Sequence, residues 1–263
     1  MKAWTLAGAV ALLAAVAVGP TSDRVPPGRL DLVLARGELR VCSTGDYQPF
    51  TYHDPVNGRW SGIDVDLAAD LAARLGVRRS MVPTTWPTLL RDFSARCDIA
   101  MGGIAVTPDR ARHASFSTSY LLDGKTPITR CTNAGRFTTL EEIDQPGVRV
   151  VVNPGGTNEQ FVRSHLHRAT ILPWPDNNTV FDQLISGHAE VMVTDASEAR
   201  WQAVRHPRLC PVHPDHPFST AAKAYLLPPG DEIWKRRVDS WLADVRHDGT
   251  WDRIANPLLG LVD

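Results

Sequence analysis

The sequence predicts an α/β protein of two lobes, each built on a largely parallel sheet with the ligand cleft between them. Strand-like apolar runs alternate with helix-like stretches, which is typical of parallel sheets covered by helices. This series runs once through about residue 120 and begins again near residue 148. No long Pro-, Gly- or Ser-rich linker separates the two series, so short extended crossovers are expected at 125–131 and 222–227. Lobe 1 is expected to comprise residues 28–126 and 219–263, and lobe 2 residues 127–218.

In the first half, a strand is expected at 39–44 (LRVCST), followed by a helix from Asp64. Leucines recur four residues apart in this helix, which places them on one face. Asp64 is the expected N-cap, and Gly76 is the expected stop. The same reasoning predicts a short helix at 86–93, a buried strand at 98–103 and a helix start at Thr107-Pro108.

In the second half, a strand at 148–152 (VRVVV) runs into Asn153-Pro154-Gly155-Gly156. Thr157 is then expected to begin a helix, with Gln160 completing a capping box. Further elements are expected as a helical face at 180–185 that stops at Gly187, a strand at 191–194 and a final helix at 234–245.

The composition excludes several classes of protein and indicates export. Lys+Arg number 28 against 29 Asp+Glu, so the basic excess typical of nucleic-acid-binding proteins is absent. At the N-terminus, Lys2 precedes an uncharged apolar run at 4–18 and then Pro20, which is typical of a signal peptide over residues 1–19. An uncleaved membrane anchor is the alternative. We therefore expect a periplasmic or extracellular protein with no stable membrane association.

Four cysteines are too few for a disulfide-built scaffold, but an exported chain permits bridges. Four cysteines allow three pairings, and the residues alone do not choose among them. Cys42 and Cys97 border apolar strand-like runs, where small buried core residues are as good an interpretation as a bridge.

Ligands of such sheets bind beyond the carboxyl ends of the strands, so four segments are of interest, at 44–52, 102–110, 153–159 and 195–198. They contain aromatic residues, glycines before a helix start, and the cation Arg110. A helix N-terminus and a guanidinium both favour anions, which predicts a cleft for a small anion with an aromatic or apolar body. The alternatives are that Arg110 is a surface helix residue and that the glycines form a plain strand-to-helix turn.

Several motifs taken together resemble the type II periplasmic solute-binding proteins that carry polar amino acids. They are TGDYQPFTY, G-x-D-V-D-L-A, DIAMGGIAVTPDR, F-S-x-x-Y, NPGGTNEQF and TDASEAR, and they span about residues 28–258. The resemblance implies that Arg110 grips the ligand carboxylate with help from Thr157. It also implies that Asp195 takes the ligand amine.

A closer set of motifs resembles the cyclohexadienyl dehydratases, a family of exported enzymes on this fold. The set comprises D-G-K-T-P-I-T, E-x-I-D-Q-P-G-V, N-P-G-G-T-N-E, P-D-N, K-A-Y-L-L-P and T-x-W-P-x-L-x-R-D-F. The resemblance implies a disulfide between Cys131 and Cys210. The chain departs from the pattern at Gly102 and Ala105, where hydroxyl residues are expected, and in having two further cysteines.

These enzymes convert prephenate to phenylpyruvate, or arogenate to phenylalanine, by loss of carbon dioxide and the ring hydroxyl. The reaction needs a general acid, cations for the carboxylates and a pocket closed to water, but no metal or organic cofactor. The resemblance assigns the acid to Glu159. An ordinary first-turn Glu, stabilised as the anion by the helix dipole, is the alternative.

The remaining substrate-binding candidates each have a structural alternative. Lys125 either neutralises a carboxylate or is a hinge surface charge, and three aromatic residues either wall the ring or belong to the core. The candidates from the strand ends and their neighbours are Tyr47, Phe50, Trp86, Gly103, Lys125 and Asn153.

We therefore expect an exported dehydratase that acts on a small carboxylate substrate. The alternative is a non-catalytic receptor that delivers an amino acid to an ABC permease, a partner expected only in that case. Glu159 within N-P-G-G-T-N-E, together with D-G-K-T-P-I, separates the two, because a transport receptor has little reason to keep a carboxylic acid beside a bound carboxylate.

Overall fold

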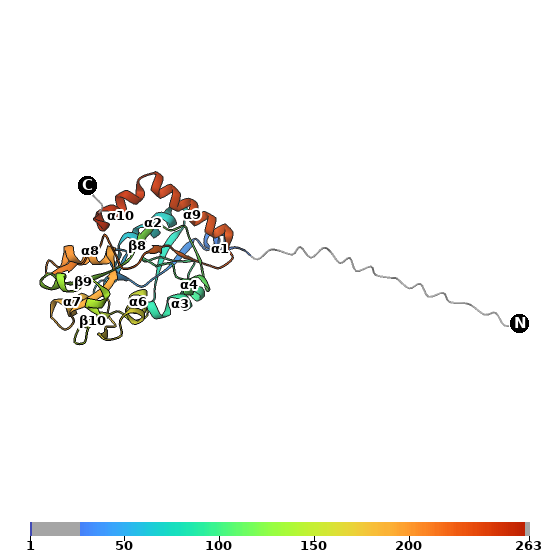
Figure 1. Ribbon diagram of the computed structural model, residues 1–263. Helices are drawn as coiled ribbons and strands as arrows, with labels where there is room; N and C mark the ends of the chain where they lie inside the picture. Colours follow the sequence, from blue (N-terminus) through green and yellow to red (C-terminus); the bar gives the residue numbers. More distant parts are fainter. Residues whose placement is uncertain (2–26, 261–263) are drawn as a thin grey trace.

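The computed structural model describes residues 1 and 27–260, whose strands form two five-stranded sheets joined by a two-stranded ribbon. Helices α1, α2, α9 and α10 gather over one sheet, whereas α7 and α8 lie with strands β9 and β10 in the other part of the molecule (Figure 1). The prediction of a two-lobe α/β fold is confirmed. The predicted signal peptide, residues 1–19, lies outside the described residues apart from Met1.

The first sheet combines parallel strands from the first half of the chain with one strand from its end. β1 pairs with β5 and β6 in parallel, and β15 pairs with β6 and β7 in antiparallel fashion. In spatial order the strands are β5 (Arg78–Pro83), β1 (Glu38–Ser43), β6 (Ile99–Ala100), β15 (Leu226–Leu227) and β7 (Ser115–Phe116). A separate small sheet holds β2 (Asp46–Tyr47), β3 (Thr51–His53) and β4 (Trp60–Ser61).

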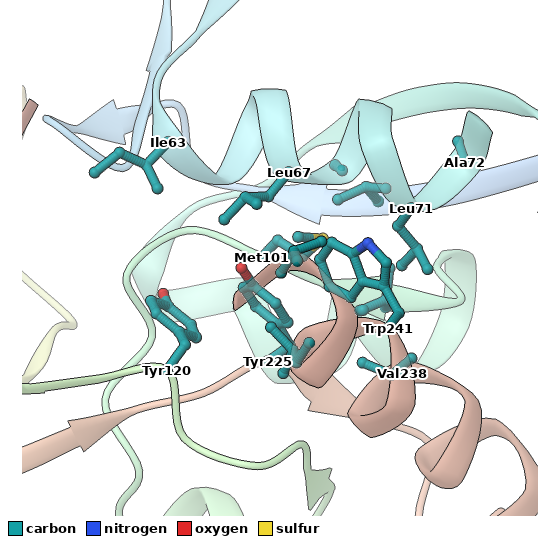
Figure 2. Packing of buried hydrophobic residues seen from close by; sticks show 14 of the residues in the cluster. Ile63, Leu67, Leu71, Ala72, Met101, Tyr120, Tyr225, Val238 and Trp241 are labelled. Carbon is teal, nitrogen blue, oxygen red and sulfur yellow. The ribbon is translucent and has the colours of Figure 1, made fainter. Parts of the chain in front are cut away.

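Helices from both ends of the chain cover the first sheet. They are α1 (Arg29–Arg36), α2 (Ile63–Arg74), the 3₁₀ turn η1 (Trp86–Thr88), α3 (Leu89–Arg96), α4 (Pro108–Ala111), α9 (Glu232–His247) and α10 (Thr250–Leu259). The apolar stripe of α2 packs against Val238 and Trp241 of α9, with Met101 and Tyr225 between them (Figure 2). This burial joins α9 to residues of α2 that lie about 170 positions earlier in the chain. Burial of apolar surface of this kind is the main favourable contribution to the stability of lobe 1.

The second sheet follows the same plan. β10 pairs in parallel with β11 and β12, and β9 runs antiparallel between β12 and β13. Its strands in order are β11 (Thr170–Pro173), β10 (Arg149–Val152), β12 (Val191–Asp195), β9 (Lys125–Arg130) and β13 (Leu209–Pro211). Its helices are the 3₁₀ segment η2 (Cys131–Arg136), α5 (Leu140–Ile143), α6 (Thr157–His165), α7 (Val180–Ile185) and α8 (Ala196–Arg205).

The chain passes between the sheets through the ribbon of β8 (Leu121–Asp123) and β14 (Ala221–Lys223). The crossover expected at 125–131 is wrong, because residues 125–130 are β9, an interior strand of the second sheet. The crossover expected at 222–227 overlaps β14 and runs into β15 of the first sheet. The lobe boundaries stay a prediction. The second sheet begins at Lys125, two residues before the predicted start of lobe 2.

Both pairs of cysteines are bonded in the structure. Cys131 is joined to Cys210 within the second sheet region, with their Cα atoms 4.8 Å apart. Cys42 of β1 is joined to Cys97 at the end of α3, with their Cα atoms 5.7 Å apart. Each lobe therefore carries one bridge of its own.

Local signals placed several helix ends correctly but misread two side chains. Thr107 caps α4 by accepting the N–H of Arg110 at 3.2 Å, and Gly76 has a positive φ of 68° after α2, as expected. Asp64 is not the N-cap of α2 but its second residue, and its carboxylate points into the core. Likewise, α6 begins at Thr157 with Gly156 as N-cap, so the capping box with Gln160 does not form. Both side chains are engaged in tertiary contacts instead.

No helix in the part of the chain that the structure describes is long and apolar enough to cross a membrane.

Candidate functional site

A small cavity lies between the lobes where the carboxyl ends of the strands meet. Its volume is about 20 Å³, enough for about one water molecule. A substrate therefore enters only when the lobes or the lining side chains move apart. Lobe 1 lines the cavity with Tyr47, Trp86, Gly103, Ala105, Arg110 and Lys223, and lobe 2 with Asn153, Gly156, Thr157, Asn158, Asn177 and Asp195.

The structure brings most of the predicted site residues together. Seven of them line the cavity: Tyr47, Trp86, Gly103, Arg110, Asn153, Thr157 and Asp195. Lys125 lies directly behind this wall, since its Nζ contacts both Thr157 and Asp195. Phe50 is fully buried behind Tyr47, with the two rings stacked 5.5 Å apart, so it supports the wall from the core. Glu159 does not line the cavity.

Asp195 is the centre of a buried charge cluster. Its Oδ1 accepts from Lys125 Nζ at 2.7 Å, and its Oδ2 accepts from Lys223 Nζ at 2.5 Å. The hydroxyl of Tyr47 also donates to Oδ2. Burial acts to raise the pKa of Asp195, but the two lysines outweigh it and hold this pKa below its ordinary value. The cluster thus carries two cations for one anion and crosses from lobe 1 to lobe 2.

Arg110 supplies a further cation on the lobe 1 side. Its side chain comes from α4, with the residue only 8% exposed, and one terminal nitrogen donates to the carbonyl of Ala105 at 2.8 Å. The guanidinium lies 5.7 Å from the ring centre of Trp86. Burial lowers the pKa of Arg110 to about 10, and within residues 27–260 no ion pair joins it. A buried cation of this kind is ready to bind a carboxylate.

The N-terminus of α6 faces Arg110 from lobe 2. Thr157 Oγ1 accepts from Lys125 Nζ at 3.0 Å, and Asn158 Oδ1 accepts from the same nitrogen at 2.5 Å. Gly155 has a φ of 85°, and a Cβ there would lie 2.5 Å from Pro87, so the turn before α6 needs glycine to approach lobe 1 this closely. The free N–H groups of this helix start add to the positive potential of the cavity.

Glu159 lies on the outer side of the α6 start. Its Oε2 accepts the N–H of Gly155 at 2.7 Å, and its Oε1 pairs with Arg163 at 2.8 Å. These two contacts hold the pKa of Glu159 below its ordinary value, against the opposing effect of burial. In this arrangement Glu159 is an anion in the first helical turn.

Glu198 is the buried acid that the sequence reasoning missed. It is only 1% exposed, and the hydroxyl of Thr194 donates to its Oε2. Burial raises the pKa of Glu198 to about 8, and the charge of Asp195 acts in the same direction. At neutral pH Glu198 is therefore protonated. Its sequence signal is the E of T-D-A-S-E, which follows Asp195 by three residues and looks like an ordinary capping box.

Two further residues at the cavity were also missed. Lys223 stands in the K-A-Y-L-L-P motif, which was noted only as a resemblance, although a Lys inside an apolar run is itself a signal for a paired buried cation. Asn177 belongs to P-D-N and donates to the carbonyl of Asp46 at 2.7 Å, which ties lobe 2 to lobe 1. Burial raises the pKa of the neighbouring Asp46 carboxyl.

The donor sets do not match a metal site. Among the described residues, no group of three or more His, Cys, Asp or Glu side chains is arranged to hold a metal ion. The cations that line the cavity belong to Arg110 and Lys223, and Lys125 lies behind its wall against Thr157 and Asp195.

A two-lobe α/β fold with a cationic cavity between the lobes defines a periplasmic-type small-molecule-binding protein. Residues 39–260 match the family model of the bacterial extracellular solute-binding proteins, family 3, and the chain belongs to this family.

Within this family the chain is related to an enzyme. It is 53% identical over 245 residues to the cyclohexadienyl dehydratase of Pseudomonas aeruginosa, which covers 93% of this chain and 90% of that protein. Two solved structures of ancestral proteins are also similar. One is an amino acid-binding protein described as a precursor of cyclohexadienyl dehydratase, with a TM-score of 0.81, 33% identity, and coverage of 88% of this chain and 99% of that one. The other is an ancestral cyclohexadienyl dehydratase, with a TM-score of 0.56, 45% identity, and coverage of 90% and 98%.

Proposed function

We propose that this chain is an exported cyclohexadienyl dehydratase that converts prephenate to phenylpyruvate, or arogenate to phenylalanine. In this reaction the bond between the ring and its carboxylate breaks, and the electron pair enters the ring as carbon dioxide leaves. The ring carbon–oxygen bond breaks with its electrons on the hydroxyl, which takes a proton and leaves as water. The ring becomes aromatic, so the protein must hold the carboxylates, deliver one proton and exclude water.

The cations at the cavity suit a substrate with two carboxylates. Arg110, Lys125 and Lys223 carry three positive charges, and Asp195 carries one negative charge. The surplus favours binding of a dianion, to which the start of α6 contributes with Thr157. Tyr47 and Trp86 meet edge to face, with ring centres 5.5 Å apart, and offer an aromatic wall for the substrate ring.

The observation that carries the proposal is the buried Glu198, which does not itself line the cavity but is linked through Thr194 to Asn158 in the cavity wall. A general acid must hold its proton at neutral pH, and burial gives Glu198 that property. Charges on Asp195, Asp46 and Lys125 all act on its pKa, as expected for a group close to the cavity wall. A protonated carboxyl group can serve proton transfer, which merely binding a ligand does not require.

A chain of hydrogen bonds supports an orientation for the Glu198 proton. Lys125 can only donate, so the amide oxygen of Asn158 faces it, and the amide nitrogen donates to Thr194 Oγ1 at 2.9 Å. The Thr194 hydroxyl therefore gives its hydrogen to Glu198 Oε2. The acidic proton is left for Oε1, for which the described residues provide no hydrogen-bond partner. Because Glu198 does not line the cavity, this proton reaches a departing hydroxyl only after side chains of the cavity wall move.

Glu159 stays the second candidate for the acid. The resemblance assigns it this role, whereas its contacts with Gly155 and Arg163 favour the anion. Opening of the lobes or a bound substrate carboxylate would have to raise its pKa before it could donate a proton.

The test is to incubate the purified protein with prephenate and follow the absorbance of phenylpyruvate. We expect turnover in the wild type without added metal or cofactor, and its loss in Glu198→Gln. Arogenate, assayed by release of phenylalanine, shows which substrate is preferred.

The second candidate function is an amino acid receptor of an ABC transporter, favoured by the ancestral amino acid-binding neighbour. In this family resemblance Asp195 would take the ligand amine, but here its two oxygens are paired with Lys125 and Lys223. A receptor would bind amino acids, leave prephenate unchanged and require a permease as partner. A dehydratase would convert prephenate and would not require a permease. In both cases we propose that residues 1–19 direct export to the periplasm or the cell exterior.

A further inference from the structure

Asp64 is a fully buried carboxylate that has no part in the proposed proton transfer or carboxylate binding. Its Oδ2 accepts the N–H of Gly103 at 2.6 Å and the hydroxyl of Tyr120 at 3.0 Å, and its Oδ1 accepts the hydroxyl of Tyr225 at 2.9 Å. Burial raises the pKa of Asp64 to about 6, with these three donors acting against it. The group is therefore ionised at neutral pH, and hydrogen bonds to a buried anion are strong.

The three donors come from three places that matter to the site. Gly103 lines the cavity. Tyr120 immediately precedes β8 and Tyr225 follows β14 by two residues, so the tyrosines flank the ribbon through which the chain passes between the lobes. Their ring centres are 4.7 Å apart, and Figure 2 shows both hydroxyls pointing toward the helix that carries Ile63 and Leu67.

The loop held by Asp64, residues 102–105, leads directly to two of the cations. The carbonyl of Ala105 accepts from Arg110 at 2.8 Å, and Ala105 pairs as an isolated bridge with Lys223. Gly103 has a φ of 62°, and a Cβ there would lie 2.5 Å from Phe50, so the loop has little room to move while the core is intact.

We propose that Asp64 is a positioning residue that ties the 102–105 loop to the inter-lobe ribbon and thereby orients Arg110 and Lys223 for the substrate carboxylates. Asp64 touches no reacting atom in this role. Its effect passes through Gly103 to Ala105, and through the two tyrosines to the β8–β14 ribbon. The inference rests on the proposed function, because that function supplies the substrate whose carboxylates Arg110 and Lys223 would bind.

The test compares Asp64→Asn with Val238→Ala, a matched control in the same buried cluster. Both variants lose stability, but only Asp64→Asn removes the buried negative charge and leaves one acceptor oxygen for the three donors Gly103, Tyr120 and Tyr225. We expect hydrogen exchange of the 102–106 segment, measured by mass spectrometry, to rise by about tenfold in Asp64→Asn and to match the wild type in Val238→Ala. Equal exchange in the two variants would overturn the proposal.

The kinetic readout separates positioning from general destabilisation. With prephenate, Asp64→Asn should raise KM by about tenfold and change kcat less, while Val238→Ala changes neither at a temperature where both are folded. A fall in kcat alone, with an unchanged KM, would contradict a role in orienting the carboxylate-binding cations.

Tyr225→Phe keeps the inference testable if Asp64→Asn does not fold. It removes the donor to Oδ1 but keeps the ring and the bond from Gly103, so a smaller rise in loop exchange is expected. Unchanged exchange in Tyr225→Phe would then overturn the proposal. Wild-type protein that fails to convert prephenate would defeat the proposed function, whereas the exchange comparison would still decide the role of Asp64.

Discussion

Two helices of the second lobe begin with the same local pattern and place their glutamates in opposite environments. α6 follows β10 and α8 follows β12, and Glu159 and Glu198 each stand at the third helical position. The Glu159 side chain is 19% exposed and pairs with Arg163, whereas Glu198 is 1% exposed and accepts a hydrogen bond from Thr194.

The difference teaches that a helix start does not by itself set the chemistry of a carboxyl group. The dipole favours the anion at both positions. At Glu159 a backbone N–H and a guanidinium add to it, and the pKa falls. At Glu198 burial and the neighbouring Asp195 outweigh it, and the pKa rises to about 8. Of the two, only Glu198 keeps a proton to donate at neutral pH.

Exchanging each glutamate for glutamine gives the largest expected effect. Glu198→Gln keeps the size of the side chain but has no transferable proton, so kcat for prephenate should fall by ~10²–10⁴. Glu159→Gln, the matched control at the equivalent position, should stay within about threefold of the wild type. The reverse result, measured by phenylpyruvate absorbance, would move the acid to the start of α6.

Substitution of Arg110 tests whether the substrate carboxylate is bound from lobe 1. Arg110→Ala removes the buried guanidinium, and binding of phenylpyruvate should weaken by ~10²-fold, as measured by calorimetry. Arg112→Ala is the control, because Arg112 is the exposed C-cap residue of the same short helix and pairs with Asp109. Equal affinities in the two variants would show that the α6 side alone binds the anion.

The pH dependence of the free energy of unfolding should distinguish the two glutamates in the absence of substrate. Glu198 has an ordinary pKa of 4.5 and a folded-state pKa of about 8, so over that interval the folded protein binds more protons than the unfolded chain. Its contribution to the free energy of unfolding therefore falls as pH rises. Glu198→Gln should be the more stable protein at pH 8 by on the order of 1 kcal/mol, and its advantage should shrink toward pH 5.

Glu159→Gln should behave in the opposite sense. The lowered pKa of Glu159 stabilises the folded state above its ordinary value, and this contribution is lost as pH falls through the folded-state pKa. The variant should be slightly less stable than the wild type at pH 7 and equal to it in acid. Urea unfolding at a series of pH values measures both curves. Parallel curves for the two variants would remove the distinction between the sites.

Removal of the Arg163 partner gives the smallest expected effect. Arg163→Met leaves Glu159 with the N–H of Gly155 alone, so the pKa of Glu159 should rise slightly, since an exposed i,i+4 ion pair contributes only about 0.3–0.5 kcal/mol. NMR titration of the Glu159 carboxyl measures this shift, and turnover should not change. An increase in turnover on removal of Arg163 would indicate that Glu159 donates the proton after all.

Much of the fold could be predicted because its signals are local. The strands at the starts of the two series, the cap at Thr107 and the stop at Gly76 depend on neighbours in the sequence, and the structure has them as expected. β9 was taken for a crossover because its pairing partners, β12 and β13, come from much later in the chain. Asp64 resembled a cap for a similar reason, since Tyr225, one of its partners, lies 161 residues away.

The candidate site, like the fold, could be predicted only in part from the sequence. Resemblance and strand ends together pointed to Arg110, Thr157 and Asp195, which line one cavity. They did not indicate that Asp195 is held by Lys125 and Lys223, because ion pairs between distant segments leave no periodic signal.

By itself, the sequence determined the alternation of strands and helices, the two-lobe class and the segments that meet at the cleft, because apolar periodicity and helix-end signals act over a few residues. Only the tertiary structure decided which glutamate carries a proton. Protonation depends on how much water and which charges surround a carboxyl group. At Glu198 these are set first by burial, then by the nearby Thr194 and Asp195 and by Asp46 from the other half of the chain. Desolvation is a property of the packed core, and no local pattern records it.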